Sequence, residues 1–298
     1  MNNKLLTEYF PLRPALHLPA GRDEDQIHAE LRRVRIAGAP EEIVNYCDQD
    51  WRRFLYTYGL AEGLTGRALE IGANPYFTTY LLKTFTSLEL TLTNYFDSHF
   101  KDTAQLVAMP NADGVVKELT LKFDHFDVES SRFPYPDQSF DVVFFCEVME
   151  HMTNDPLSAL REINRVLRPG GTLILTTPNV ARLENVARLV AGANIYDPYS
   201  GYGPHGRHNR EFIMHELFLM LQWCGFDFDL QFTADVHDNH SLNYIGQSQL
   251  EQLCPILNFR RLDLGQYLFT RSVKKRAPRL NRPNWLYRSY PLGELVEQ

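Results

Sequence analysis

The sequence predicts an α/β protein: a doubly wound, mostly parallel sheet with helices on both faces. Three observations carry this prediction. From residue 63 onward, short apolar segments of strand length alternate with longer segments whose apolar residues recur at helical spacing. Glycines and prolines mark the changes between segments, and the chain contains no internal repeat. Because this alternation requires crossover helices, we expect parallel strands with ligands at their carboxyl ends.

The elements are expected in a definite order. Two amphipathic helices over residues 24–34 and 41–60 come first, and the second repeats its apolar residues at three- and four-residue steps. Asp155 suits the N-cap of a later helix, and Pro156 suits its first turn. Further strands are expected at 68–71, 88–93, 119–123, 140–146 and 172–177, and further helices at 78–85, 155–167, 183–191 and 214–224.

The chain divides into three expected regions. Residues 1–62 form an N-terminal helical cap, residues 63–270 form the α/β domain with an inserted lid at 181–212, and residues 271–298 form a basic C-terminal arm. The first twelve residues of this arm contain no Asp or Glu. They carry six basic side chains: Arg271, Lys274, Lys275, Arg276, Arg279 and Arg282. A solvated surface arm is the simpler interpretation. Peripheral contact with an acidic membrane surface or a polyanionic acceptor is the alternative.

Composition limits the class of protein. With 298 residues and 44% hydrophobic residues the chain can bury a sizeable core, and its net charge of −7 argues against general nucleic-acid binding. The four cysteines are far apart and fit neither a disulfide framework nor a zinc site. The N-terminal residues lack the apolar centre of a secretory signal, and no apolar run reaches the length of a membrane span. We therefore expect a cytoplasmic protein without a transmembrane segment.

The turn after the first strand of the α/β domain is suited to ligand binding. In the segment GRALEIGANPYFTT, Glu70 ends the strand and Gly72 lies in the turn before the next helix. A ligand that approaches a strand end and a helix start needs a backbone with little side-chain bulk. The segment resembles the first motif of class I S-adenosylmethionine-dependent methyltransferases, an acidic residue, one apolar residue and a glycine-rich turn. Asn74 and Tyr76 stand where that family usually has its second and third glycines.

Two later segments extend the resemblance. They are HFDVESSRFPYPDQSFDVVFFCEVMEH, residues 125–151, and LRPGGTLILTTPN, residues 167–179. In order and spacing they are similar to the ubiquinone-biosynthesis-like branch of the family, also called methyltransferase type 11. The resemblance implies a Rossmann-like methyltransferase fold with a seven-stranded sheet, S-adenosyl-L-methionine as the cofactor, and methylation as the reaction of a transferase.

The resemblance also implies contacts at the methionine end of the cofactor. Backbone atoms of Gly72 and Ala73 approach the methionine part, Asn74 belongs to the same turn, and Glu70 organises the ammonium group through water. Cys146 and Glu147 end the fourth strand beneath the cofactor.

At the nucleoside end, the resemblance implies that Asp127 accepts from the adenine amine and that the Val128 backbone N–H meets a ring nitrogen. Asn94 stands where the family usually has an acid that binds both ribose hydroxyls. An amide can accept one hydroxyl bond and donate another, so Asn94 is expected to bind ribose. Asp97 is the alternative if the strand register differs.

Two histidines are the candidate catalytic groups, because transfer to a hydroxyl requires a proton acceptor near neutral pKa. His151 follows the fourth strand, with Glu150 as a partner that orients it; the alternative is that His151 caps or packs the helix start. His208 lies in a His-x-Arg pattern that members of this branch often carry.

The acceptor is expected between Asn179 and the lid, and the candidate substrate-binding residues of the lid are Tyr202, His205, Arg207 and Arg210. An ion pair between Arg210 and Glu211 is the structural alternative.

Two other groups are expected to be structural. His237, Asp238 and His240 include acid and imidazole ligands, but their spacing on a strand would place neighbours on opposite faces, so no metal is expected. The stripe Trp51, Phe54 and Tyr58 is expected to lie in the core, with coverage of adenine or acceptor as the alternative.

The sequence thus predicts a methyltransferase that acts on an oxygen, or alternatively a nitrogen, of a small-molecule or sugar-containing acceptor. Two other hypotheses stay open. The altered turn suits a noncatalytic methyltransferase-like binding or partner protein, and the sheet alone suits a nicotinamide-dependent dehydrogenase, although the complete Gly-x-Gly-x-x-Gly turn is missing. The oligomeric state does not follow from the sequence.

Overall fold

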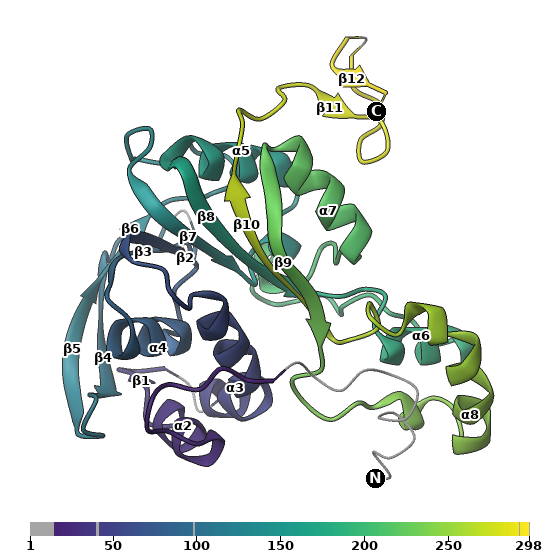
Figure 1. Cartoon of the computed structure of the whole chain (residues 1–298), viewed down its shortest axis with the longest axis horizontal. Coiled ribbons are helices and arrows are strands. Elements are labelled where there is room, and N and C mark those ends of the chain that lie inside the picture. Colours follow the sequence, from purple (N-terminus) through teal and green to yellow (C-terminus); the bar gives the residue numbers. More distant parts are fainter. Residues whose placement is uncertain (1–14, 40–41, 98, 292, 298) are drawn as a thin grey trace.

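The computed structural model describes residues 15–39, 42–97, 99–291 and 293–297 (Figure 1). Residues 1–14 of the expected cap, and position 41 at the expected start of its second helix, lie outside the described residues. The centre of the molecule is a seven-stranded sheet with strand order β6-β3-β2-β7-β8-β10-β9. Five neighbouring strands pair in parallel, and β10 is antiparallel to both of its neighbours. The predicted doubly wound, mostly parallel sheet is therefore confirmed.

The strands of this sheet are β2 (Gly66–Ile71), β3 (Leu88–Asn94), β6 (Asp124–His125), β7 (Phe140–Cys146), β8 (Leu167–Pro178), β9 (Phe226–Ala234) and β10 (Tyr267–Lys274). The expected segments 68–71, 88–93, 140–146 and 172–177 lie in β2, β3, β7 and β8, whereas the sequence did not predict β6, β9 and β10. Parallel strands need their crossover helices, and these are α4 (Phe77–Phe85), α5 (Pro156–Val166) and α7 (Met214–Trp223). Asp155 caps α5 as expected: its side chain accepts from the backbone N–H of Leu157.

Helices cover both faces of the sheet because alternate strand residues point to opposite sides. On one face, Ala68, Val142 and Phe144 pack against α2 (Glu24–Leu31), α3 (Glu42–Leu60) and α4. On the other face, Leu69, Val143 and their neighbours pack against α5 and α7. Figure 1 shows the two groups of helices on opposite sides of the strands.

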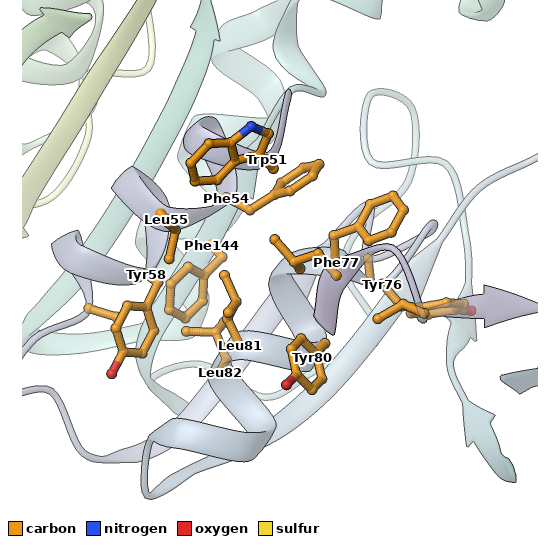
Figure 2. Close-up of a cluster of buried hydrophobic side chains, with 14 of the residues drawn as sticks. Trp51, Phe54, Leu55, Tyr58, Tyr76, Phe77, Tyr80, Leu81, Leu82 and Phe144 are labelled. Carbon is orange, nitrogen blue, oxygen red and sulfur yellow. The ribbon is translucent and has the colours of Figure 1, made fainter. Parts of the chain in front are cut away.

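The aromatic stripe of α3 belongs to the first of these cores. Trp51, Phe54 and Tyr58 are buried, and Figure 2 shows them in one cluster with Phe77, Tyr80 and Leu81. The rings of Phe54 and Phe77 stack with centroids 5.0 Å apart. The packing therefore supports the expectation that this stripe lies in the core.

One expected strand lies in a different sheet. The segment 119–123 belongs to β5 (Val116–Lys122), which forms a hairpin with β4 (Ala104–Pro110), and β1 (Arg35–Ile36) adds a third strand. The hairpin is inserted between β3 and β6 in the sequence, β1 comes from the cap, and this small antiparallel sheet stands beside the cap helices (Figure 1). The third strand of the main sheet is instead the short β6.

The lid region opens with α6 (Leu183–Val190), as predicted, and passes through the short η2 (Pro204–Gly206). Together with η3 (Ser241–Asn243), α8 (Gln247–Ile256) and η4 (Asn258–Arg260), α6 forms a separate lobe around Leu183, Leu250 and Leu264. In Figure 1 this lobe projects from the carboxyl end of the sheet.

The C-terminal segment is not the irregular basic arm that the sequence suggested. Strand β10 continues to Lys274, across the expected boundary at residue 271, and β11 (Arg282–Pro283) pairs with β12 (Leu295–Val296). Five of the six basic side chains contact protein groups: Arg271 pairs with Asp229, Lys274 donates to the Asn164 and Leu167 carbonyls, Arg276 pairs with Asp227, Arg279 covers Trp223, and Arg282 pairs with Asp155. These contacts attach the basic cluster to the fold, while Lys275, Arg276 and Arg279 stay exposed, so peripheral contact through the cluster stays a prediction. No helix in the described part of the chain combines the length and apolar composition needed to cross a bilayer.

Candidate active site

Two adjoining cavities lie at the carboxyl ends of β2, β3 and β7, where a doubly wound sheet binds its ligands. The larger cavity has a volume of about 190 Å³ and the smaller about 60 Å³. The two cavities adjoin each other, because four residues line both: Ile71, Gly72, Asn74 and Glu147.

The turn after β2 divides the two cavities. Gly72 has φ +72°, and a Cβ there would lie 2.7 Å from a methyl group of Val148, so only glycine fits this turn. The backbone N–H groups of Gly72 and Ala73 both donate to the Thr93 carbonyl, at 2.9 and 3.1 Å. Any backbone contact from these two residues to a ligand therefore involves their carbonyl groups.

The smaller cavity is lined by charged groups of the cap and the sheet. Glu70, on β2, is buried, accepts from the Thr79 hydroxyl at 2.7 Å, and has its pKa raised to about 8 by burial. Arg53 reaches the cavity from α3 with its guanidinium 3.7 Å from Glu147. Arg53 is 4% exposed, and its Nε has no hydrogen-bond partner among the described residues. The same guanidinium lies 3.3 Å from Asp50 and 3.7 Å from Glu147, so Nε is the part of it that can still bind a hydrogen-bond acceptor such as a carboxylate.

Glu147 connects the two cavities. It has φ +54°, an unusual backbone conformation for a residue with a side chain, and its carboxylate accepts from the Thr176 hydroxyl at 2.8 Å. Burial raises the pKa of Glu147, and the Arg53 guanidinium acts in the opposite direction. Cys146, the residue before it, lines the smaller cavity, and burial raises the pKa of its thiol to about 12, so it stays protonated.

The expected adenine residues line the larger cavity. Asp127 and Val128 follow β6, and the Asp127 carboxylate also accepts from the Glu129 backbone N–H and the Ser130 hydroxyl. Glu129 in turn accepts from three successive backbone N–H groups, those of residues 153–155. This carboxylate fixes the segment after η1 (Met149–His151) to the segment that carries Asp127.

Asn94 does not have the position that its expected ribose role requires. It is 3% exposed and lines neither cavity. Its side-chain oxygen accepts from the Asn74 N–H at 2.8 Å and its nitrogen donates to the Tyr76 hydroxyl at 3.1 Å. Both halves of the amide are used within the protein. Asp97 does not replace it, because it lines neither cavity and accepts from the backbone N–H groups of its own loop.

His151, at the end of η1, lines the larger cavity. Its Nδ1 lies 3.0 Å from the Arg207 carbonyl, which can only accept, so the neutral ring carries its proton on Nδ1 and its lone pair on Nε2. Burial and the neighbouring His208 cation lower the pKa of His151. Glu150 Oε1 lies 3.9 Å from Nε2, is buried, and has no hydrogen-bond partner in the part of the chain that the structure describes.

His208 lies behind His151, with ring centroids 5.0 Å apart, and does not line either cavity. Its Nδ1 lies 3.0 Å from a Glu211 oxygen and 3.6 Å from Asp197. Burial acts to lower the pKa of His208, but the Glu211 hydrogen bond, together with Glu150 and Asp197, outweighs it and raises the pKa to about 9. His208 is therefore a cation at neutral pH and cannot act as the general base that the sequence suggested.

The other lid residues divide into two groups. His205 lines the larger cavity, whereas Tyr202 is 86% exposed and Arg207 covers the ring of the exposed Tyr199. Arg210 pairs with Glu216, a different acid from the Glu211 that the sequence suggested.

Asn179 is not a substrate ligand, because it is completely buried. Its amide donates to the carbonyls of Asp263 and Gly265 and accepts from the Ala181 N–H. These bonds anchor the end of β8 to the lobe.

Two trios of described side chains bring possible ligand atoms within 4.8 Å of one another: Glu150, His151 and His208, and Asp197, His208 and Glu211. His208 belongs to both as a protonated, ion-paired group, which explains the clustering without a metal. His237, Asp238 and His240 belong to neither trio. The Nδ1 of His237 lies 3.0 Å from the Gln266 side-chain nitrogen. That no metal is needed stays a prediction.

Comparison with known proteins identifies the domain around these cavities. Residues 69–175 match a family described as a methyltransferase domain. The chain carries a class I methyltransferase domain. S-adenosylmethionine is the cofactor of such domains, and they are enzymes.

Curated relatives match part of this chain. A Mycolicibacterium smegmatis protein named as a probable S-adenosylmethionine-dependent methyltransferase is 27% identical over 126 residues, 41% of this chain and 44% of that protein. The ubiquinone biosynthesis O-methyltransferase of Ruegeria pomeroyi is 33% identical over 109 residues, 36% of this chain and 42% of that protein. The chain thus spans less than half the length of these relatives.

A solved structure agrees with the fold of the methyltransferase. One chain of a complex that contains the Haloferax volcanii Trm112 methyltransferase activator superimposes with a TM-score of 0.50 at 17% identity. The match covers 86% of this chain and all of that chain.

The residues of the methyltransferase site fit S-adenosylmethionine. The unsatisfied Arg53 Nε suits a carboxylate, the buried acids Glu70 and Glu147 suit a molecule with ammonium and sulfonium charges, and Gly72 leaves the turn open.

The sequence prediction missed three residues of the site: Arg53, Glu129 and Tyr95. The Tyr95 ring stacks on His125, with centroids 5.4 Å apart, and lies edge-on to His205. Arg53 had a signal, because it is a charged residue beside the apolar stripe of α3. Tyr95 directly follows a strand end, which was also a signal.

Proposed function

We propose that the chain transfers the methyl group of S-adenosylmethionine to a hydroxyl oxygen of a small-molecule or sugar-containing acceptor. One observation carries the proposal. His151, a neutral imidazole with its Nε2 lone pair available, lines the same cavity as Gly72, Asp127 and Glu147 of the cofactor motifs. A proton acceptor and the cofactor residues thus share one space, as hydroxyl methylation requires.

The cofactor would be held at both ends by residues of this chain. Arg53 and Glu70 would hold the charged groups of its methionine part, and Asp127 and Val128 its adenine. When bound, it supplies an electrophilic methyl group on a sulfonium. Glu147, which lines both cavities, places a carboxyl group between the two ends.

The remaining chemistry is proton transfer. His151 Nε2 would accept the hydroxyl proton of the acceptor as the methyl group is transferred to the acceptor oxygen. The Arg207 carbonyl keeps the ring oriented through Nδ1, and the positive His208 keeps it unprotonated until this step. Glu150, whose buried Oε1 accepts no hydrogen bond from any described residue and lies 3.9 Å from Nε2, can then stabilise the new charge on His151.

The acceptor would enter beneath the lid. His205 reaches the larger cavity, and the exposed rings of Tyr196, Tyr199 and Tyr202 occur along the preceding loop. Exposed aromatic rings suit a planar or sugar-containing acceptor. Oxygen is preferred to nitrogen because a neutral base is present and because the Ruegeria pomeroyi relative is named an O-methyltransferase. The cytoplasm is the proposed location, in keeping with the free cysteines.

The noncatalytic alternative would be favoured by a filled cofactor site. The cavity of about 190 Å³ among the motif residues argues for the enzyme instead.

Radiolabelled S-adenosylmethionine tests the proposal with a panel of phenolic, sugar-containing and amine acceptors. We expect transfer of label to at least one hydroxyl acceptor, and loss of that transfer in His151→Gln. A protein that binds the cofactor but labels none of the panel would favour the noncatalytic alternative, and labelling of amines alone would contradict the choice of oxygen.

A further inference from the structure

A closed set of hydrogen bonds connects the cofactor turn to the inserted hairpin. Gln105, on β4, accepts from the Tyr76 hydroxyl at 2.5 Å and from the Asn74 side-chain nitrogen at 3.1 Å. The Tyr76 hydroxyl accepts from Asn94, and Asn94 accepts from the Asn74 backbone N–H. Four residues from three elements therefore form one ring of bonds.

The ring fixes the part of the turn where the family usually has glycine. Tyr76 has φ +70° and is completely buried, so its side chain is held inside the protein while its backbone keeps a conformation typical of glycine. Asn74 lines both cavities, and the ring holds it twice, through its backbone N–H and its side chain. The shape of the cavity wall at Asn74 therefore depends on partners outside the turn.

We propose that Gln105 is a positioning residue for the cofactor: through Asn74 and Tyr76, the inserted hairpin holds the turn after β2 in its binding shape. It takes over a task that glycines usually perform in this family, and it explains why Asn94 is buried as a structural group. Gln105 is half-buried and lines neither cavity, so it acts only through its two partners. The inference rests on the proposed function, because it concerns the same cofactor.

The bonds themselves suggest the variants that test this role. In Gln105→Leu, the Tyr76 hydroxyl and the Asn74 amide lose their acceptor while the side chain keeps a similar size. In Gln105→Glu, a carboxylate oxygen still accepts from both donors. Leu106→Thr is the matched control, because Leu106 is the next residue on β4 and is 43% exposed.

The experiment is calorimetric titration of the full chain with S-adenosylhomocysteine, with melting temperature and kinetics beside it. We expect Gln105→Leu to bind about tenfold more weakly, and Gln105→Glu and Leu106→Thr within about twofold of wild type. With any acceptor that is turned over, Gln105→Leu should raise the KM for S-adenosylmethionine and leave kcat within about twofold, a split that general loss of stability does not produce.

Tyr76→Phe completes the design. It removes only a hydroxyl, so it serves where Gln105→Leu fails to fold, and the loss in the double variant should be smaller than the two single losses added together, because both variants break the Tyr76–Gln105 bond. Wild-type affinity in Gln105→Leu and Tyr76→Phe, or a Gln105→Glu variant as weak as Gln105→Leu, would overturn the inference. Failure of the wild-type chain to bind at all would instead remove the proposed function, and the inference with it.

Discussion

Replacing His208 with glutamine should raise the pKa of His151. Glutamine can keep a hydrogen bond to Glu211, but it removes the positive charge whose ring centroid lies 5.0 Å from that of His151. That charge is one cause of the lowered His151 pKa, second to burial. Without it, the protonated form of His151 becomes easier to reach.

The size of the effect follows from Coulomb's law. Two unit charges about 5 Å apart repel by ~0.8 kcal/mol in water and by ~3 kcal/mol at an effective dielectric constant of 20. These energies correspond to pKa changes of about 0.6 and about 2.4. Because Glu211 and Asp197 partly neutralise His208, the lower part of this range applies, and we expect a rise of about 0.5 to 1.

Nuclear magnetic resonance of the imidazole carbons measures this directly and needs no acceptor. His151 is assigned by loss of its signal in His151→Gln, and His215→Gln is the control because that side chain is exposed on α7. We expect the His151 pKa to rise in His208→Gln and to stay unchanged in His215→Gln. An unchanged or lower His151 pKa in His208→Gln would refute the view that a cationic His208 keeps His151 neutral.

Four further predictions concern the same site. His151→Gln should lower kcat by about 100-fold and change the Kd for S-adenosylhomocysteine by less than about twofold, measured by initial rates and calorimetry, since general bases contribute that much; a retained kcat returns His151 to a packing role. Arg53→Met should weaken S-adenosylhomocysteine binding by about tenfold and binding of adenosine alone by much less, because the guanidinium faces the methionine end; equal losses would contradict that placement. Asp127→Ala should weaken S-adenosylhomocysteine binding more than Asn94→Ala does, and the reverse order would mean that Asn94 contacts the ligand. His208→Gln should lower the free energy of unfolding most at pH ~6 and least above pH ~9. The reason is that the raised pKa of His208 stabilises the folded state fully below the pKa of the unfolded chain, and this stabilisation is lost as the pH rises through the folded-state pKa. A difference from wild type that does not change with pH in denaturant titrations would exclude a charged His208.

The regular elements could be predicted because their signals are local. The expected strand at 140–146 coincides with β7, and the expected helix at 183–191 differs from α6 by one residue. The hairpin of β4 and β5 was missed because a short apolar run at 119–123 fits a parallel strand and a hairpin equally well. The connecting residues Asn111 to Gly114 form a turn signal that could have identified it.

The site was less predictable because its groups are set by contacts distant in the sequence. The motif placed Asn94 correctly at the end of β3, but its role depends on Tyr76 and Asn74, 18 and 20 residues away. His208 resembles a base in the sequence, and only its approach to Glu211, Asp197 and Glu150 makes it a cation. Residue types and strand ends were readable, whereas charge states and occupied hydrogen bonds required the folded chain.

Calorimetric titration of the wild-type chain with S-adenosylmethionine and S-adenosylhomocysteine tests the central claim most directly. The account predicts binding of both at one site per chain, with an affinity that falls in Arg53→Met and Asp127→Ala. No heat from either compound at millimolar concentration, with a chain shown to be folded by its melting transition, would contradict it.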